Sequence, residues 1–431
     1  MSTGSPEHTP SPASDVDLDR MQHPDEVRET VLRFAVAIPT EQVRIVEAIW
    51  RILAEDLVAT EDHPPFPAAT MDGYAVLAND HSPWREVLGG QMAGQMLDLD
   101  VTPGTAVRIT TGAPMPPGAD AVVQVELTEP TEDHVIIHQE DVPSGQNVRP
   151  VGVDLKRGDL LLAAGTMLGP AEVGLVAGFA PLPVAVRRRV RVSILSTGDE
   201  LVEPGDPLGP GQIRDSNRFS LMAAVQGEGA DVIWAGKGPD ERESLRAVLL
   251  DRIAASDVVI TSGGVSMGEL DLIKALLGEI PSVTVHVRRV FMKPGKPFNF
   301  ATADRGDGAP PVLIFGLPGN PVSALAGFEV FLRPALASLA GRREVDRPRV
   351  PVRLLHDTPA SDRIEYQRGI VRVDGNGRLV AETTGSQASS RLVSFVGANA
   401  LLEIHPRETA YAAGEEVRAL LLAPPWPVDP A

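Results

Sequence analysis

Polar and glycine-rich stretches follow the predicted strands between residues 190 and 340, where they could bind an anion. The first strand ends in Ser196-Thr-Gly-Asp-Glu200, the third in Ser262-Gly-Gly-Val-Ser266, and the last in Gly316-Leu-Pro-Gly-Asn-Pro-Val-Ser323. Glycines let a ligand approach backbone N–H groups, and the start of a following helix adds the positive end of its dipole. Each loop could also be a plain tight turn, but together they favour a ligand that carries phosphate.

A basic turn, Lys293-Pro-Gly-Lys296-Pro297, places two ammonium groups close together. The whole chain carries 39 Lys and Arg against 58 Asp and Glu, a formal net charge of −19. An anionic substrate therefore needs a local basic pocket, because the overall field repels it. The turn is a candidate for that pocket, and the alternative is that both lysines are solvated. A second basic run, Arg187-Arg-Arg-Val-Arg191, could bind phosphate, but a solvated linker and strand edge is the simpler interpretation.

Two aspartates, Asp240 and Asp271, could hold a hard divalent cation through carboxylate oxygens. Asp240 has a structural alternative: it precedes a predicted helix and Glu243 follows three residues later, which is the pattern of a capping box. Asp271 would otherwise be an exposed carboxylate on a helix. No histidine spacing suggests zinc, and the lack of cysteine excludes thiolate zinc sites, disulfides, cysteine nucleophiles and iron–sulfur ligation.

A repeating strand–helix pattern must position these side chains. Apolar periodicity predicts strands at residues 190–195, 231–235, 258–261, 283–290 and 311–315, alternating with helices at 216–226, 245–253, 270–277 and 321–339. Repeated βαβ units require a parallel sheet with right-handed crossovers. The loops described above then meet at the carboxyl ends of the strands, where such sheets bind ligands.

The flanking regions follow other patterns. Residues 40–53 place their apolar side chains on one face of a predicted helix that Thr40 caps. Residues 71–150 contain short apolar runs divided by proline and glycine, which indicates a small β domain. A further helix is predicted from Ala171. Residues 349–425 are again β-like, with a hairpin turn at residues 374–377.

Composition bounds the class of protein. The 431 residues suggest about three domains, and 43% hydrophobic with 23% charged residues is typical of a globular protein. The negative charge argues against nucleic acid and anionic membranes as partners. The first 20 residues are polar, and the longest uncharged apolar stretch, residues 173–186, is too short to cross a bilayer. We therefore expect a cytoplasmic protein with a disordered tail over residues 1–24.

Eight motifs occur in an order that is typical of one family. They are Met71-Asp-Gly-Tyr-Ala-Val76, Thr111-Gly-Ala-Pro114, Ser196-Thr-Gly-Asp-Glu-Leu201, Ser262-Gly-Gly-Val-Ser-Met-Gly268, Lys293-Pro-Gly-Lys-Pro297, Pro318-Gly-Asn-Pro-Val-Ser323, Tyr366-Gln-Arg-Gly369 and Thr384-Gly-Ser-Gln-Ala-Ser389. Over residues 25–425 the chain resembles the molybdopterin molybdenumtransferases, which include bacterial MoeA and the E domains of gephyrin and its plant counterpart. One such motif would be weak, whereas eight spread over every predicted domain are highly specific.

The resemblance implies an elongated subunit of α/β and β domains. A discontinuous first domain (residues 25–70 and 151–189) surrounds an inserted small β domain (71–150), and a central three-layer αβα domain with a parallel sheet (190–342) precedes a C-terminal β-barrel (343–431). Members of this family are homodimers whose active sites lie between domains of opposite chains. They insert molybdate into adenylated molybdopterin with Mg2+ and release AMP, which yields the molybdenum cofactor.

The resemblance also implies roles for individual residues. It implies a molybdate site of Lys293, Lys296, Ser323, Arg368 and Ser389, with Asp240 and Asp271 as magnesium ligands. Catalytic roles fall on Asp72, Thr111 and Glu200 beside the two lysines. The remaining substrate contacts are Arg149, Asp154, Ser262, Gly263, Gly264, Ser266, Pro297, Gly319, Asn320, and Arg289, which stands where many members have lysine. The stretch Ser386-Gln-Ala-Ser389 departs from the more common His-Gln-Gly-Ser, which bears on the register of Ser389.

Two other functions fit parts of the sequence. A gephyrin-like scaffold would bind peptides, but we find no long linker or second module of that kind among these 431 residues. A molybdopterin adenylyltransferase would use the central domain alone, which leaves Asp72 and Arg368 without a role. The upstream adenylyltransferase and the molybdoenzymes are instead expected as protein partners, with molybdate and adenylated molybdopterin as substrates.

Overall fold

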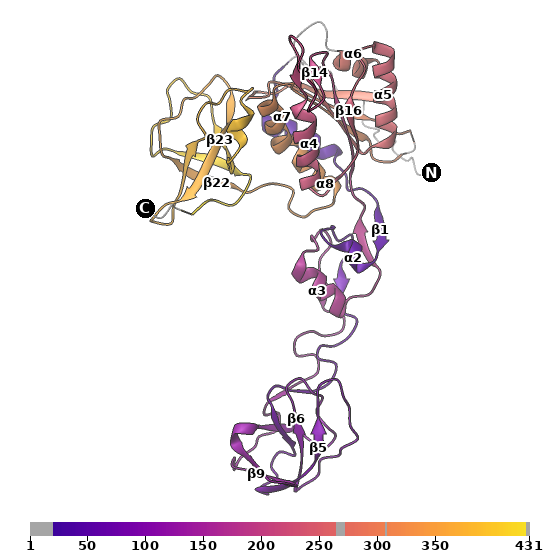
Figure 1. Ribbon diagram of the computed structural model, residues 1–431, viewed down its shortest axis with the longest axis vertical. Helices are drawn as coiled ribbons and strands as arrows, with labels where there is room; N and C mark the ends of the chain where they lie inside the picture. The colour runs from indigo at the N-terminus through magenta and orange to yellow at the C-terminus, as the bar shows by residue number, and fades with distance from the viewer. Residues whose placement is uncertain (1–19, 264–271, 307, 428–431) are drawn as a thin grey trace, which may run out of the picture.

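The computed structural model describes residues 20–263, 272–306 and 308–427. These residues form an elongated molecule (Figure 1). A central domain and a C-terminal barrel lie side by side at one end, and a small β domain lies at the other end. A slender module joins the two ends, and the chain runs through it once in each direction.

The central sheet has six strands in the order β16-β13-β17-β21-β20-β18. Their bounds are Arg191–Ser196 (β13), Asp231–Lys237 (β16), Val258–Ser262 (β17), Val283–Arg289 (β18), Pro297–Ala303 (β20) and Val312–Leu317 (β21). Five strands run in one direction, as predicted, and β20 runs antiparallel to both of its neighbours. The expectation of a wholly parallel sheet is therefore corrected. Only a short loop connects β18 to β20, and a parallel neighbour would need a much longer crossover.

Helices cover both faces of this sheet. One face packs against α1, α4, α7 and α8, and the other against α5 and α6. Their bounds are Pro24–Phe34 (α1), Ser216–Gly227 (α4), Arg242–Ala255 (α5), Leu272–Glu279 (α6), Pro321–Gly327 (α7) and Arg333–Leu339 (α8), with a π-helical turn at Phe328–Leu332. Successive residues of a strand face opposite cores, so Ile260 packs on the α4 side and Val259 on the α5 side. The predicted three-layer αβα domain is confirmed.

Helix α1 packs in this core although it precedes the central domain by more than a hundred residues. Its Val27 and Val31 are fully buried with the side chains of α8. Before it, the Gln22 N–H donates to the Arg289 carbonyl at 3.1 Å, and the Phe291 N–H donates to the Gln22 carbonyl at 2.8 Å. The predicted tail over residues 1–24 is thus too long at its end, because the central sheet holds the chain from Gln22 onward.

The segment Pro321–Leu339 is long and apolar enough to cross a membrane. However, 83% of that window is buried inside the central domain, where it forms α7, the π-helical turn and α8. Its apolar side chains therefore belong to the core that supports the sheet.

The slender module is built from short antiparallel pairs between distant segments. The strand β1 (Thr40–Val43) pairs with β12 (Val184–Arg187), and β2 (Leu57–Val58) pairs with β11 (Leu160–Leu162). The predicted helix over residues 40–53 is wrong, since only α2 (Ile45–Ala48) is helical there. Pairing with β12 satisfies the backbone groups of β1, and this tertiary contact overrides the apolar period. The helix predicted from Ala171 is confirmed as α3 (Pro170–Phe179).

The inserted domain is a six-stranded sheet in the order β7-β4-β6-β5-β9-β8, as the short apolar runs predicted. Its strands are Gly73–Val76 (β4), Trp84–Gln91 (β5), Thr105–Ile109 (β6), Ala121–Gln124 (β7), Thr128–Pro130 (β8) and His134–Ile137 (β9), with a 3-10 turn at Val125–Leu127. A two-strand pair, β3 (Ala68–Ala69) with β10 (Val148–Arg149), closes its base. The chain therefore enters and leaves this domain at one point.

The C-terminal domain is a closed five-stranded barrel. Its strands are Arg349–Leu354 (β22), Ile364–Val373 (β23), Leu379–Thr383 (β24), Ala400–Ile404 (β25) and Glu416–Leu421 (β26). The barrel closes because β23 pairs with both β24 and β25. Asp374 Oδ1 accepts from the Asn376 and Arg378 N–H groups at 2.8 Å each, which confirms the predicted hairpin turn. The two-residue strand β19 (Met292–Lys293) of the central domain adds to β23 in parallel.

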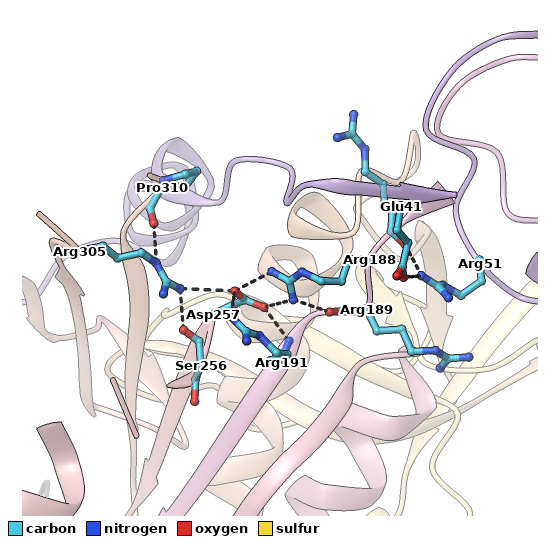
Figure 2. A network of polar contacts seen from close by, with 10 residues as sticks. Glu41, Arg51, Arg188, Arg189, Arg191, Ser256, Asp257, Arg305 and Pro310 are labelled. Atoms are coloured by element: carbon cyan, nitrogen blue, oxygen red, sulfur yellow. Dashed lines mark hydrogen bonds and ion pairs between the residues drawn. The ribbon is translucent and has the colours of Figure 1, made fainter. Parts of the chain in front are cut away.

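The basic run between β12 and β13 forms a joint (Figure 2). Arg188 donates to both carboxylate oxygens of Asp257, at 2.8 and 3.0 Å, and Arg305 and Arg191 approach the same carboxylate at 3.4 and 3.7 Å. Asp257 is only 6% exposed. The expectation of a solvated linker is therefore corrected, because this buried carboxylate engages Arg188 and Arg191 and fixes the module to the central sheet.

Candidate active site

Two adjoining cavities lie on the central domain. The barrel-side cavity, about 640 Å³, lies between the basic turn, the start of α7 and the barrel. The sheet-edge cavity, about 980 Å³, lies beyond the carboxyl ends of β13, β17 and β21. Pro297 and Asn320 line both cavities. The two cavities therefore adjoin at these residues.

The barrel-side cavity gathers four of the residues that the resemblance links to molybdate. Lys293 and Lys296 come from the turn between β18 and β20, Ser323 from the first turn of α7, and Ser389 from the barrel. Asn320 Nδ2 donates to Ser389 Oγ at 3.1 Å, and the Val322 N–H donates to the Ser389 carbonyl at 3.2 Å. The barrel loop is thus attached to the start of α7, which is why these distant segments form one cavity.

Arg368, the fifth of these residues, lies behind the cavity wall. It is fully buried, and its Nε donates to Ser394 Oγ at 3.0 Å while Nη2 donates to the Ala388 carbonyl at 3.4 Å. Burial lowers the pKa of Arg368 to about 10, although the nearby Glu365 carboxylate opposes this. Within the described residues its Nη1 has no hydrogen-bond partner. In this geometry Arg368 supports the loop that carries Ser389, and a direct contact with the oxyanion stays a prediction.

The sheet-edge cavity gathers the glycine-rich loops. Ser262 ends β17 and Gly263 follows it, and Gly319 and Asn320 follow β21. Gly263 has a φ of 85°, and a Cβ there would lie 2.3 Å from the Thr197 carbonyl oxygen, so only glycine fits. Backbone N–H groups and hydroxyls at this edge suit a phosphate group. Gly264, Ser266 and Asp271 lie outside the described residues.

Asn217, which is not among the predicted site residues, organises this cavity. Its Nδ2 donates to Ser262 Oγ at 2.9 Å and to the Gly319 carbonyl at 2.8 Å. Asp215 precedes it as the N-cap of α4 and accepts from the Arg218 N–H at 3.1 Å. The Asp-Ser-Asn pattern before an apolar run is a helix-start signal and could have indicated this position. It could not have indicated the two loops that Asn217 joins.

Carboxylates line one side of the sheet-edge cavity. Asp199, Glu200 and Asp240 contribute to it, beside the short pair β14 (Leu201–Val202) and β15 (Ile213–Arg214). The hydrogen bond from Asp199 to the Asp240 carboxyl, together with the charge of Asp240, raises the pKa of Asp199. Two adjacent carboxyl groups are an oxygen donor set that suits a hard cation. No group of three or more acidic or histidine side chains suited to a metal occurs within the described part of the chain.

Asp240 does not cap α5. The N-cap is Glu241, whose carboxylate oxygens accept from the Glu243 N–H at 2.9 Å and the Ser244 N–H at 2.7 Å. The capping-box interpretation of Asp240 is therefore wrong by one residue, because α5 begins at Arg242 and Glu241 is the residue that caps its first turn. Asp240 remains available to the cavity.

Four predicted residues lie far from both cavities of the same chain. Asp72 accepts from the Thr111 N–H at 2.7 Å and from its hydroxyl at 2.8 Å, and these hydrogen bonds lower the pKa of Asp72. Arg149 forms an ion pair with Asp154 near the base of the inserted domain. Neither pair lines either of these two cavities, and Figure 1 places the inserted domain at the opposite end of the molecule. One chain therefore does not bring all the predicted site residues together.

Arg289 also lies outside the lining of both cavities. It is the last residue of β18 and stands opposite Pro297 in the register with β20. Arg289 therefore lies at the base of the basic turn. The next residue, Val290, closes this turn by donating its N–H to the Lys296 carbonyl at 3.1 Å.

Comparison with known proteins agrees with this arrangement. Three family models match in chain order: the MoeA N-terminal region (domain I and II) over residues 23–180, a probable molybdopterin binding domain over 193–338, and the MoeA C-terminal region (domain IV) over 352–422. A molybdopterin molybdenumtransferase of Haemophilus influenzae is 36% identical over 382 residues, covering 88% of this chain and 93% of that protein. The chain belongs to the MoeA family of molybdopterin molybdenumtransferases.

Other relatives extend this result to eukaryotes and to solved structures. Gephyrin of Dictyostelium discoideum is 36% identical over 89% of this chain, which corresponds to 60% of that longer protein. A crystal structure of the molybdopterin biosynthesis MoeA protein from Pyrococcus horikoshii superimposes with a TM-score of 0.78 at 32% identity, covering 94% of this chain and all of that one. The MoeA fold is thus shared along almost the entire chain.

Proposed function

We propose that this MoeA-family enzyme inserts molybdate into adenylated molybdopterin and releases AMP, in the cytoplasm. The observation that carries the proposal is the pair of adjoining cavities that share Pro297 and Asn320. One contains two lysines and two serines for an oxyanion, and the other contains glycine-rich loops for a phosphate. A substrate with a pterin, a pyrophosphate and a nearby oxyanion would span both.

In the barrel-side cavity, Lys293 and Lys296 would neutralise the molybdate dianion, and Ser323 and Ser389 would donate hydroxyl hydrogen bonds to its oxygens. The ammonium groups hold a charge of the right sign in a chain whose overall charge is −19. Charge-assisted hydrogen bonds of this kind also fix the orientation of a tetrahedral anion. Arg368 would keep the Ser389 loop in place from behind.

In the sheet-edge cavity, the loops at Ser262 and Gly319 would bind the pyrophosphate through backbone N–H groups. Asp240, with Asp199 beside it, would hold Mg2+, and Asp271 is its predicted second ligand. Bound Mg2+ supplies Lewis-acid polarisation of the phosphoanhydride. A molybdate oxygen or a water would attack phosphorus and form a new P–O bond as the P–O bond to the bridging oxygen of the anhydride breaks. AMP would then leave, and the dithiolene sulfurs of the pterin would take up the molybdenum.

The adenylyltransferase and scaffold alternatives receive less support. An adenylyltransferase needs only the central domain, but the basic turn opens onto a cavity that the barrel completes through Glu365, Gln367 and Ser389. A scaffold needs no oxyanion cavity. The two cavities are therefore best explained by an enzyme that handles both groups.

We further propose that the enzyme works as a homodimer. The slender module exposes large apolar side chains, including Val46 (62%), Trp50 (59%) and Leu160 (58%), which a second copy of the chain could cover. A second copy that covered this module could bring its Asp72 and Thr111 pair to the cavities of the first. Light scattering should then give about twice the 45.8 kDa chain mass.

AMP release from adenylated molybdopterin on addition of molybdate tests the reaction itself. Lys296→Ala should raise the molybdate concentration needed for half-maximal release by about tenfold to a hundredfold, because it removes one charge-assisted contact. Binding of the adenylated pterin should change little, since the sheet-edge cavity is intact. An unchanged molybdate requirement would remove Lys296 from the site, and no AMP release by the parental enzyme would contradict the proposal.

A further inference from the structure

The barrel-side cavity contains a buried carboxylate in a place where an oxyanion site needs positive charge. The side chain of Glu365 is only 5% exposed, and its Oε1 lies 3.3 Å from Lys293 Nζ. Both residues line the cavity. In the pairing of β19 with β23, Lys293 stands directly opposite Glu365, so the strand register holds the two side chains together.

The two lysines of the basic turn are therefore not equivalent. Lys293 has a carboxylate partner, and its side chain is 45% exposed. Lys296 lines the same cavity and has no acidic partner among the residues that the structure describes. Within the described part of the chain, an entering oxyanion therefore meets one ammonium without an acidic partner and one that is already paired with a carboxylate.

The other carboxylates around this cavity are engaged elsewhere. Glu382 pairs with Arg372 at 3.2 Å and with His356 at 3.8 Å. Asp357 accepts from the Ala413 N–H at 2.8 Å. Neither contacts Lys293, so Glu365 is the carboxylate positioned to compete with a bound oxyanion.

We propose that Glu365 is a built-in counter-ion that occupies Lys293 before substrate binds and yields it to the oxyanion. This inference rests on the proposed function and adds to it a residue that lowers the resting affinity of the oxyanion site. A tethered carboxylate weakens the binding of every oxyanion by a similar factor, because it competes for the same ammonium. Sulfate and phosphate, which have no further bonds to make, then leave quickly, whereas molybdate is retained when the pterin sulfurs bind its metal.

The test is direct binding of inorganic molybdate and of inorganic sulfate to the full chain, measured by isothermal titration calorimetry without any pterin. Glu365→Gln keeps the shape and removes the charge, and it should tighten both anions by about threefold to tenfold, a range limited by the solvent exposure of Lys293. The matched control, Glu382→Gln, removes a carboxylate from the same lining and should change either affinity by less than about twofold. In turnover, Glu365→Gln should lower the KM for molybdate without raising kcat.

A second variant and a second control separate the possible failures. Glu365→Asp retains the charge but shortens the side chain, so it should tighten both anions by a smaller factor than Glu365→Gln does. Unchanged or weaker binding in both Glu365 variants would overturn the counter-ion role. The proposed function would still stand in that case, provided that Lys296→Ala weakens molybdate binding. If Lys296→Ala leaves both affinities unchanged, the oxyanion site itself is misplaced.

Discussion

Asp257 lies where the slender module joins the central sheet, and three guanidinium groups close on its carboxylate (Figure 2). Burial by itself would raise the pKa of Asp257, but the hydrogen bonds from Arg188 and from the Arg191 N–H outweigh this and hold the pKa below its ordinary value. The folded state therefore favours the ionised carboxylate. Three cations around one buried anion also make the removal of that anion costly.

Asp257→Asn should lower the free energy of unfolding of the central domain by about 2–3 kcal/mol at neutral pH, because it leaves the guanidinium groups unpaired. The pKa is lowered on folding, so this contribution is complete above the ordinary carboxyl pKa and disappears as pH falls through the lower folded value. The difference between parent and variant should thus shrink below about pH 4.

Urea unfolding followed by Trp234 fluorescence measures this difference. Trp234 belongs to β16, and the other three tryptophans, Trp50, Trp84 and Trp426, lie outside the central domain and can be replaced by phenylalanine. A variant as stable as the parent at pH 7, or a difference that stays constant down to pH 3, would show that the joint does not depend on the Asp257 charge.

Two neighbouring carboxylates at the start of helix α5, Asp240 and Glu241, have different roles. Glu241 caps the helix through two backbone N–H groups, whereas Asp240 faces the sheet-edge cavity and Asp199. The hydrogen bonds from Ser244 and Glu243 lower the pKa of Glu241, which is the expected effect of a helix N-terminus on a capping anion. The two positions are therefore a matched pair for mutation.

Glu241→Ala should lower the thermal midpoint by about 2 °C, measured in the protein whose only tryptophan is Trp234, because the helix loses its cap. AMP release should stay nearly unchanged. Asp240→Asn should do the opposite: an unchanged midpoint, and a steep fall in AMP release that extra Mg2+ restores only in part. If both variants lose stability and both keep activity, Asp240 has only a structural role.

The shape of the whole molecule leaves Asp72 and Thr111 far from the cavities of their own chain (Figure 1). A site shared between two copies would use the Lys296 of one chain and the Asp72 of the other. The Asp72→Ala and Lys296→Ala homodimers would then each carry two defective sites, but a mixed dimer would carry one intact site.

Refolding the two variants together should therefore restore about a quarter of the parental AMP release, since half of the dimers are mixed and each has one working site. Each variant refolded alone is the control and should stay inactive. Mixtures that never exceed the sum of the separate variants would mean that each site is built within one chain.

The sequence by itself determined the family, the αβα centre and the loops that carry its chemistry. The reason is local: strand periodicity, glycine-rich turns and the order of eight motifs are written in contiguous residues. Most strands and helices of the central domain, the inserted β domain and the hairpin at Asp374 are therefore found where the pattern predicts them.

Only the tertiary structure decided which residues share a surface. The first four residues of the helix predicted over 40–53 form the strand β1 instead, because a segment more than a hundred residues away pairs with them. Asn217 and Glu365 acquire their roles from loops and strands that are distant in sequence. The Arg368 side chain points toward Ser394 and away from the cavity, because the barrel buries this position on β23. Such contacts depend on how elements pack, and no local pattern in the chain encodes them.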